Sequence, residues 1–303
     1  MRNACKQVLY DLVREDSSVM LLTADGHDMY QELSPEYHSQ FVDYGIAESN
    51  MVASAAGLAS CGKIPFLFAV TNFMAMRAFE FIRDMVCIPS YNVKFLGFFS
   101  GLSRGAWGAT HHGTEDLTLL RCLPNLLVIT PATPIEAHEA VKFAYRYQGP
   151  VYIRLESSNE VELYDQEYEF ALGKGHVLRS GYDITVVAMG SVINEAIQAS
   201  DFLRNKGISV RVIDLSMIKP LDEKLILSAA SETNHIITLE EHSIYGGLGS
   251  ALAEFLLEHK ARTSFIRMGL DGIARGCGNQ KEMREINHLS ANDIVQKVHQ
   301  LLE

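Results

Sequence analysis

The seven residues GIAESNM, at positions 45–51, decide how the rest of the sequence is interpreted. They indicate the end of a strand, a turn, and the start of a helix over 51–59 that is made almost wholly of small and apolar residues. A helix that is apolar all round is buried, either deep in the protein or at a subunit interface. Burial favours the protonated, hydrogen-bond-donating form of the Glu48 carboxyl group, unless a partner compensates. The alternative is that Glu48 only caps the first turn and interacts with the helix dipole.

The composition is that of a globular protein with room for two domains. The chain has 303 residues, of which 48% are hydrophobic and 21% charged. Its net charge of −11 argues against nucleic acid and anionic membranes as partners. Its five cysteines form no C-x-x-C pair, so free thiols in a reducing compartment are the default. The N-terminus lacks the apolar segment of a signal peptide and no run of about twenty apolar residues occurs, so we expect a cytoplasmic protein.

Short apolar runs alternate with helical segments along the chain. Strands are predicted at 19–24, 64–70, 92–98 and 126–130, and helices at 4–14, 72–83 and 134–146. This alternation is typical of a parallel sheet covered by helices. The acidic stretch 156–169 lacks periodicity and indicates a connection. We therefore predict an α/β fold with two domains, each a mostly parallel sheet flanked by helices, at 1–156 and 173–303, with a linker at 157–172.

The surroundings of Glu48 resemble a known family. The segments FVDYGIAESNM at 41–51, AAGLA at 55–59 and GKIPF at 62–66 are similar to the pyrimidine-binding domain of transketolase-like enzymes, which depend on thiamine diphosphate. The resemblance covers nearly the whole chain, and residues beyond 173 resemble the C-terminal domain of the same family. It implies that Glu48 hydrogen-bonds the aminopyrimidine ring of the cofactor. The proton shared there helps to deprotonate the thiazolium carbon, the electron sink for breaking carbon–carbon bonds.

Three more residues are expected to contact the cofactor by this resemblance. Ile46 belongs to the G-I-x-E motif that contains Glu48. In relatives, the helix after the strand 64–70 opens with aromatics that pack against the pyrimidine ring, and Phe73 takes the stacking position here. Val70 stands where relatives often carry a second aromatic. An aromatic stripe at helical spacing is more often part of a hydrophobic core, so both interpretations of Phe73 stay open.

A glycine-rich loop, SGLSRGAWGATHHG at 100–113, follows the strand 92–98. Loops with this much glycine can come very close to a ligand. The segments THHGTEDL at 110–117 and LRCLPN at 120–125 match the family's T-H-x-x-x-x-x-L…R-x-x-P-N signature. In that signature, His111 takes the place of the active-site histidine, which contacts the substrate and can act as acid or base. The resemblance makes Glu48 and His111 the candidate catalytic residues.

One half of the family's active site is missing from the sequence. Relatives anchor thiamine diphosphate through Mg²⁺ with a G-D-G…N motif, because a diphosphate needs hard oxygen ligands on a shared divalent ion. No G-D-G occurs in this chain, and we assign it no metal ligand. By resemblance to split transketolases and 2-oxoacid dehydrogenases, we expect a separate subunit to carry the diphosphate-binding domain. The expected assembly is an α2β2 heterotetramer.

Three positions of the expected substrate pocket depart from the family pattern. Relatives that act on ketose phosphates usually have a histidine at Phe99, an aspartate at Trp107 and an arginine at Ser157. Those groups bind sugar hydroxyls and the acceptor phosphate, and an arginine fork is hard to replace for phosphate. His111 and His112 would complete the pocket. The alternative for Trp107 is a loop aromatic that fills space.

The favoured function is the beta-like subunit of a two-component, thiamine-diphosphate-dependent enzyme. It would transfer a two-carbon ketol or acyl unit to or from an atypical, non-phosphorylated substrate. The alternative is a subunit that uses a 2-oxoacid, like deoxyxylulose-phosphate synthase or an oxoacid dehydrogenase, and the run THHG at 110–113 leans slightly this way. A third possibility is a non-catalytic binding relative. Retention of Glu48, Phe73 and His111 together argues against it.

Overall fold

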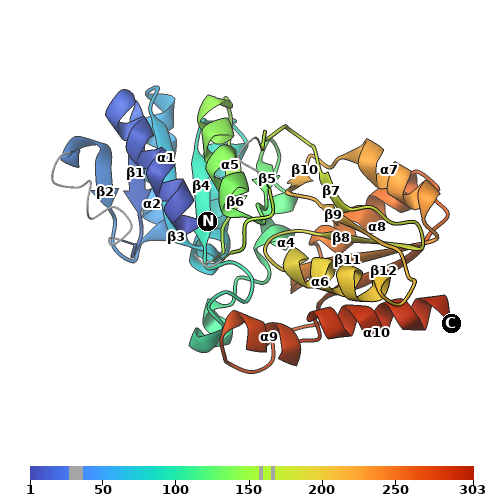
Figure 1. The fold of residues 1–303 in the computed structure, drawn as a ribbon. Coiled ribbons are helices and arrows are strands. Elements are labelled where there is room, and N and C mark those ends of the chain that lie inside the picture. The colour runs from blue at the N-terminus through green and yellow to red at the C-terminus, as the bar shows by residue number, and fades with distance from the viewer. Residues whose placement is uncertain (27–36, 157–159, 165–167) are drawn as a thin grey trace. The chain divides into compact units, whose positions relative to one another are not determined.

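The structure is a computed structural model that describes residues 1–26, 37–156, 160–164 and 168–303. Its contacts divide the chain into two compact units, whose strands and helices are labelled in Figure 1. Unit 1 comprises Met1–Ser100 and Leu119–Phe170, and unit 2 comprises Gly101–Thr118 and Ala171–Glu303. The glycine-rich loop therefore groups with the second unit, although it directly follows a strand of the first. The domain boundaries expected from the sequence stay a prediction.

Unit 1 is built on a parallel sheet. Its strands are β1 (Val19–Thr23), β2 (Phe41–Asp43), β3 (Ile64–Val70), β4 (Lys94–Phe98), β5 (Leu127–Ile129) and β6 (Val151–Arg154). They lie in the order β5-β6-β4-β3-β1-β2, and every neighbouring pair is parallel. Because the strands are parallel, their carboxyl ends meet at one edge of the sheet.

Helices cover both faces of this sheet. They are α1 (Arg2–Glu15), α2 (Glu48–Ser60), α3 (Phe79–Phe81), α4 (Asp116–Arg121), which starts in unit 2, and α5 (Pro134–Arg146). Helix α1 packs against α5, and α2 packs against the segment between β3 and β4. Right-handed crossovers in a parallel sheet place these two groups on opposite faces. Helix α5 begins where the sequence predicts, because the Thr133 side chain accepts a hydrogen bond from the Glu136 amide and Pro134 opens the first turn.

The segment between β3 and β4 differs from the continuous helix expected at 72–83. It consists of the π-helix η3 (Phe73–Arg77), the short α3, and a second π-helix, η4 (Ile82–Cys87). Apolar spacing predicts helical structure here, but it does not distinguish i+4 from i+5 hydrogen bonding. Short π-helical stretches are frequent at functional sites.

Unit 2 is a second sheet, with one antiparallel edge strand. Its strands are β7 (His176–Arg179), β8 (Ile184–Ala188), β9 (Val210–Asp214), β11 (His235–Ser243) and β12 (Ser264–Leu270), and β10 (Met217–Lys219) is a short additional strand. The order is β12-β11-β8-β9-β7, in which β7 is antiparallel to β9 and the other pairs are parallel. The helices are α6 (Ile193–Arg204), α7 (Glu223–Glu232), α8 (Leu248–Glu258), α9 (Gln280–Ile286) and α10 (Ala291–Leu302). Helix α6 packs with α10 and α7 packs with α8.

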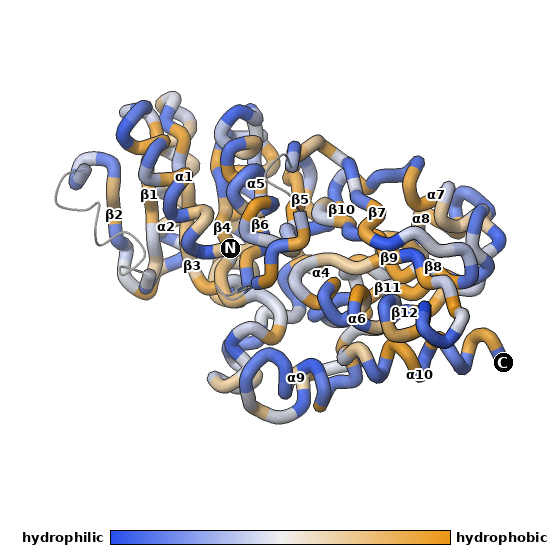
Figure 2. The backbone as a smooth tube through the Cα atoms, viewed as in Figure 1, coloured by the Kyte–Doolittle hydropathy of each residue, from blue (hydrophilic) through white to orange (hydrophobic). Residues whose placement is uncertain are grey.

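The hydrophobic cores lie between the sheets and their helices. Every residue of β1, β4 and β8 is buried, and Figure 2 shows the apolar central strands in orange. The predicted fold class, α/β with two mostly parallel sheets flanked by helices, is confirmed. Among the residues that the structure describes, no helix has the length and apolar character needed to cross a bilayer.

Helix α2 is buried on one face only. Met51, Val52 and Ala55 are inaccessible to solvent, whereas Gly57 is exposed and Leu58 half-buried. The sequence left two locations open for this apolar helix, deep in the protein or at a subunit interface. Within unit 1 its second face stays accessible, so the helix is not enclosed by its own fold.

Candidate functional site

The expected cofactor residues of unit 1 start from the carboxyl edge of its sheet. Glu48 follows β2, Phe73 follows β3 and Phe99 follows β4. Val70, at the end of β3, is the register partner of Phe98 at the end of β4. Open α/β sheets bind their ligands outside the carboxyl ends of the strands. The fold therefore places these residues at the edge where a ligand site is expected.

Glu48 is a buried carboxylate with a charged partner. Its side chain is 1% exposed in the first turn of α2, and Nη1 of Arg77 lies 2.6 Å from its Oε2. Burial penalises the charged carboxylate, and the ion pair offsets that penalty. The Arg77 side chain is 48% exposed, so the guanidinium links a buried group to solvent. Arg77 is the compensating partner whose identity the sequence left open.

Arg77 also joins Glu48 to Phe73. The guanidinium carbon of Arg77 lies 5.0 Å from the centroid of the Phe73 ring, within range of a cation–π interaction. Phe73 is half-buried in the π-helix η3, so its ring is not enclosed in the core. Sequence reasoning missed Arg77 as a site residue. Its spacing of four from Phe73 was a usable signal, but its pairing with Glu48, 29 positions away, had none.

Two apolar residues flank this group in the sequence. Ile46 is 71% exposed in the turn before α2, where Gly45 has a positive φ of 62° that favours glycine. The Asp43 carboxylate accepts a hydrogen bond of 2.9 Å from the Gly45 amide and so fixes the turn. Val70 is half-buried at the end of β3. Covering an apolar side chain as exposed as Ile46 is favourable, which suits contact with a ligand or a partner.

These side chains fit one half of a thiamine diphosphate molecule. A buried carboxylate, an accessible aromatic ring and two apolar side chains match a flat heteroaromatic ring with nitrogens at its rim, such as an aminopyrimidine. Within the described ranges, no group of three or more histidine, cysteine, aspartate or glutamate side chains has the arrangement to hold a metal ion. The residues of this chain therefore fit the pyrimidine half of the cofactor and not its diphosphate–metal half.

The glycine-rich loop of unit 2 carries the expected substrate residues. It contains two 3₁₀ turns, η5 (Gly105–Trp107) and η6 (Ala109–His111), and is closed by paired hydrogen bonds of 2.8 and 3.0 Å between Gly101 and Gly113. The Arg104 guanidinium lies 4.6 Å from the centroid of the Trp107 ring, and the His111 ring meets Trp107 edge-on at 5.1 Å. The loop thus brings Trp107 and His111 together, with Arg104 as a third member that sequence reasoning missed.

The two histidines of the loop have different surroundings. His111 is half-buried, and its Nδ1 is 3.0 Å from the Thr110 hydroxyl. His112 is 2% exposed, and its Nε2 donates a hydrogen bond of 3.2 Å to the Gly105 carbonyl. His112 therefore connects two parts of the loop to each other. Trp107 is 51% exposed, which is unusual for the only tryptophan of a chain.

Phe99 and Ser157 complete the set of expected substrate residues. Phe99 is half-buried in unit 1 and has a φ of 59°, a left-handed conformation that is strained for a residue with a bulky side chain. Its ring meets that of Phe98 edge-on at 6.4 Å. Strained backbone of this kind clusters at functional sites. Ser157 lies outside the described residues.

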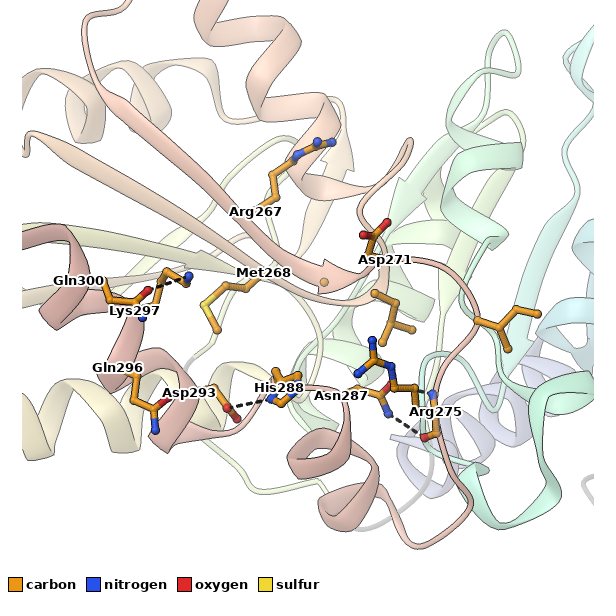
Figure 3. Close-up of a pocket in the computed structure, with 13 residues that line it drawn as sticks. Arg267, Met268, Asp271, Arg275, Asn287, His288, Asp293, Gln296, Lys297 and Gln300 are labelled. Carbon is orange, nitrogen blue, oxygen red and sulfur yellow. Dashed lines mark hydrogen bonds and ion pairs between the residues drawn. The ribbon is translucent and has the colours of Figure 1, made fainter.

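A separate cavity of about 340 Å³ lies in unit 2. Figure 3 shows its lining, which comes from β12, the chain that follows it, and the segment from Asn287 to Gln300. Charged groups of both signs line it, including Arg275, Lys297 and Asp293. None of the expected site residues belongs to it, so we do not connect this cavity with the chemistry of Glu48 or His111.

Comparisons with known proteins identify the family. Residues 1–160 match the pyrimidine-binding domain of transketolase, and residues 173–294 match the transketolase C-terminal domain. One of the two subunits of the apulose-4-phosphate transketolase from Actinobacillus succinogenes is 38% identical over 86% of this chain and 84% of its own length. A 6-deoxy-6-sulfo-D-fructose transketolase subunit from Clostridium sp. (strain MSTE9) is 32% identical over 100% of this chain and 94% of its own length.

A solved structure agrees with these sequence matches. It is a split-gene transketolase, an inactive β4 tetramer, with 36% identity, a TM-score of 0.89, and coverage of 99% of this chain and 96% of that chain. The chain belongs to the transketolase family and consists of its pyrimidine-binding and C-terminal domains. The predicted resemblance is thereby confirmed, and membership of this family implies thiamine diphosphate as cofactor.

Proposed function

We propose that this chain is the beta-like subunit of a two-component transketolase-like enzyme that transfers a two-carbon ketol or acyl unit. The observation that carries the proposal is the buried Glu48 carboxylate, paired with Arg77 beside Phe73 at the carboxyl edge of the sheet. A buried carboxylate is costly to maintain and is expected where a proton must be held.

Each of these residues has a distinct task toward the aminopyrimidine ring. The Glu48 carboxyl group holds and returns a proton at a ring nitrogen, and its burial excludes water from that exchange. Phe73 presents its ring face, and Val70 and Ile46 supply apolar contact. When bound, thiamine diphosphate supplies the electron sink needed to break a carbon–carbon bond next to a carbonyl group.

The diphosphate and Mg²⁺ would be held by a second polypeptide. This chain has no G-D-G motif, and its described residues form no metal-ligand cluster. Two similar proteins are themselves named as transketolase subunits. The accessible apolar face of α2, together with exposed Ile46, Met76 and Ile88, suits burial against the diphosphate-binding polypeptide. We propose an α2β2 heterotetramer with a cofactor at each contact between the two kinds of subunit.

The substrate pocket differs from that of enzymes for ordinary ketose phosphates. Phe99 and Trp107 are aromatic where such relatives usually carry polar side chains, and the half-exposed Trp107 next to His111 supports an aromatic wall. We favour an atypical, non-phosphorylated donor or acceptor. The alternative is a 2-oxoacid donor, for which decarboxylation precedes transfer. Two similar proteins are named for a phosphorylated and a sulfonated sugar, so a substrate screen includes both kinds as well as 2-oxoacids.

The first prediction concerns Glu48 and uses a matched control. We expect Glu48→Gln to lower kcat of the reconstituted two-subunit enzyme by about 10²-fold or more, because the amide cannot exchange the proton. Glu136→Gln is the control: Glu136 is equally buried, also lies in the first turn of a helix of unit 1, and is on the opposite face of the sheet. Its turnover should stay within about twofold of the wild type, a change of about 0.4 kcal/mol in barrier height.

Turnover is measured with a panel of ketoses and 2-oxoacids as donors. Equal activity of the wild type and Glu48→Gln would show that the catalytic assignment is wrong. A loss in Glu136→Gln as large as that in Glu48→Gln would show that removing any buried carboxylate damages the fold. No activity in the wild-type complex with any donor would favour the non-catalytic alternative.

A further inference from the structure

The glycine-rich loop is anchored at both ends to one short stretch of unit 2. At its start, the Leu102 amide donates a hydrogen bond of 2.8 Å to Oε2 of Glu241. At its end, the Ser243 amide donates to the Thr114 carbonyl at 2.8 Å, and the Leu117 amide donates to Nε2 of His242 at 3.2 Å. The anchors are thus the last residues of β11, and Glu241 is the one that holds the beginning of the loop.

Glu241 is itself fixed by helix α9. Its side chain is 1% exposed, and the Arg284 Nε donates a short hydrogen bond to its Oε1. The Gln280 amide nitrogen lies 3.1 and 3.0 Å from the two carboxylate oxygens. The Arg284 Nη2 also donates to the Ser191 hydroxyl at 2.6 Å. A buried, charge-assisted arrangement of this kind has one defined geometry, so it transmits the position of α9 to the loop backbone.

The loop backbone also contacts α9 and the preceding chain directly. A Cβ atom on Gly105 would lie 2.3 Å from Cγ of Met283 and 2.6 Å from the Gly278 carbonyl oxygen. A Cβ on Gly101 would lie 2.6 Å from Oε2 of Glu241, and Gly101 has a φ of 61°. Only glycine fits at these two points. The loop is therefore seated closely against the side chain and backbone that hold it.

We infer that Glu241 is a positioning residue that sets the conformation of the loop and thereby the orientation of Trp107 and His111. It acts on the Leu102 amide, two residues before Arg104, whose guanidinium lies over Trp107, which in turn meets His111. The C-terminal domain thus shapes the expected substrate residues without contributing a group that touches substrate. The inference rests on the proposed function only in taking this loop to be the one that meets the substrate.

The chain offers a direct probe of the loop. Trp107 is its only tryptophan, so tryptophan emission of the full chain reports on the loop without cofactor, substrate or partner subunit. We expect Glu241→Ala to increase the amplitude of the nanosecond component of the Trp107 anisotropy decay by about twofold, because loops released from their anchors move on that timescale. Glu232→Ala is the control. It removes an exposed carboxylate of α7 that pairs with Arg211 in the same unit, and it should leave the decay unchanged.

A second variant reaches the loop from its other contact. Gly105→Ala introduces a methyl group against Met283 and the Gly278 carbonyl without touching Glu241, and it should displace Trp107 in the same assay. Circular dichroism and thermal melting establish that each variant is folded, and if Glu241→Ala does not fold, Gly105→Ala decides alone. A wild-type anisotropy decay in the folded variants would overturn the inference.

Kinetics separate this inference from the proposed function. In the reconstituted enzyme, Glu241→Ala should raise KM for substrate by about tenfold, 1.4 kcal/mol, while the Kd of thiamine diphosphate stays at the wild-type value, because the Glu48 group lies in the other unit. A changed Trp107 decay in a protein without turnover would leave the anchor intact and refute the proposed function. Normal turnover with an unchanged decay would refute the anchor alone.

Discussion

At the scale of single residues, Glu48 and Glu136 show that burial alone does not mark a site. Both carboxylates are at most 1% exposed and both lie in the first turn of a helix of unit 1. Glu136 is satisfied by neutral groups, the Ala132 amide at 2.7 Å and the Tyr168 hydroxyl at 3.1 Å. Glu48 is instead paired with a half-exposed arginine. The partner distinguishes a carboxylate that completes the fold from one that can exchange a proton with a ligand.

The sequence predicted the burial of Glu48 but not its surroundings. The apolar helix 48–60 implies an enclosed first turn, and the motif identifies the carboxylate. Arg77 comes from a separate element and had no marker in the sequence that tied it to Glu48. Arg104 likewise gains its role only through its contact with Trp107. Long-range pairs of this kind depend on how the elements pack, which local patterns do not encode.

Lys94 carries a prediction on pH dependence. It is fully buried in β4, and its Nζ donates to the carbonyl oxygens of Tyr147 at 2.7 Å and Gly149 at 2.6 Å. Burial lowers the pKa of the Lys94 ammonium group from its ordinary 10.5 to about 7. Between these two values the unfolded chain binds more protons than the folded chain. The free energy of unfolding therefore rises with pH in this window, and the penalty for burying the charge is present in full below pH 7.

The variant Lys94→Met removes this titration. We expect the free energy of unfolding of the wild type, relative to Lys94→Met, to increase by on the order of 1 kcal/mol per pH unit between about pH 7 and pH 9. Urea unfolding at several pH values measures it. Lys63→Met is the control, since Lys63 donates to the Ser17 carbonyl at the surface. A difference between the wild type and Lys94→Met that stays constant with pH would contradict the assignment.

At the scale of elements, helix α2 combines the cofactor residue with an open apolar face. A Cβ added to Gly57 would meet no atom within 4 Å, so a larger side chain fits there in the single chain. Replacing glycine in a helix interior should stabilise the helix by up to about 1 kcal/mol. The same side chain would obstruct a partner that packs on this face. Folding of the chain and assembly with a partner are thus separable at this position.

Gly57→Arg tests that separation. We expect the variant to melt at or slightly above the wild-type temperature, and its affinity for the diphosphate-binding subunit to fall by more than about tenfold, or 1.4 kcal/mol. Size-exclusion chromatography with light scattering on mixtures of the two subunits measures assembly. Gln7→Arg, on the exposed side of α1, should assemble normally. Wild-type assembly of Gly57→Arg would show that α2 does not face the partner.

The elements also show where sequence patterns fall short. The helical spacing at 72–83 was real, but the backbone there is largely π-helical. The loop 101–118 follows β4 directly, so its sequence gave no reason to separate it from the first unit. Its anchor at Glu241 is 139 positions away, and only the fold brings the two together.

At the scale of the whole molecule, the chain carries part of a site. It contains the family's pyrimidine-binding and C-terminal domains. The sequence was sufficient to recognise these domains and to see that the diphosphate motif is missing. It was not sufficient to define the substrate, because a pocket completed by a second polypeptide is not encoded in this chain alone, and Ser157 lies outside the described residues.

The most direct test is a calorimetric titration of thiamine diphosphate with Mg²⁺. It is performed first on this chain alone and then on this chain copurified with the diphosphate-binding subunit. We predict saturable binding only to the mixture, because Glu48, Phe73 and Val70 can hold the pyrimidine ring but nothing in the described chain holds the diphosphate. Tight binding to the chain alone would contradict the two-component assignment, and binding to neither preparation would contradict the catalytic one.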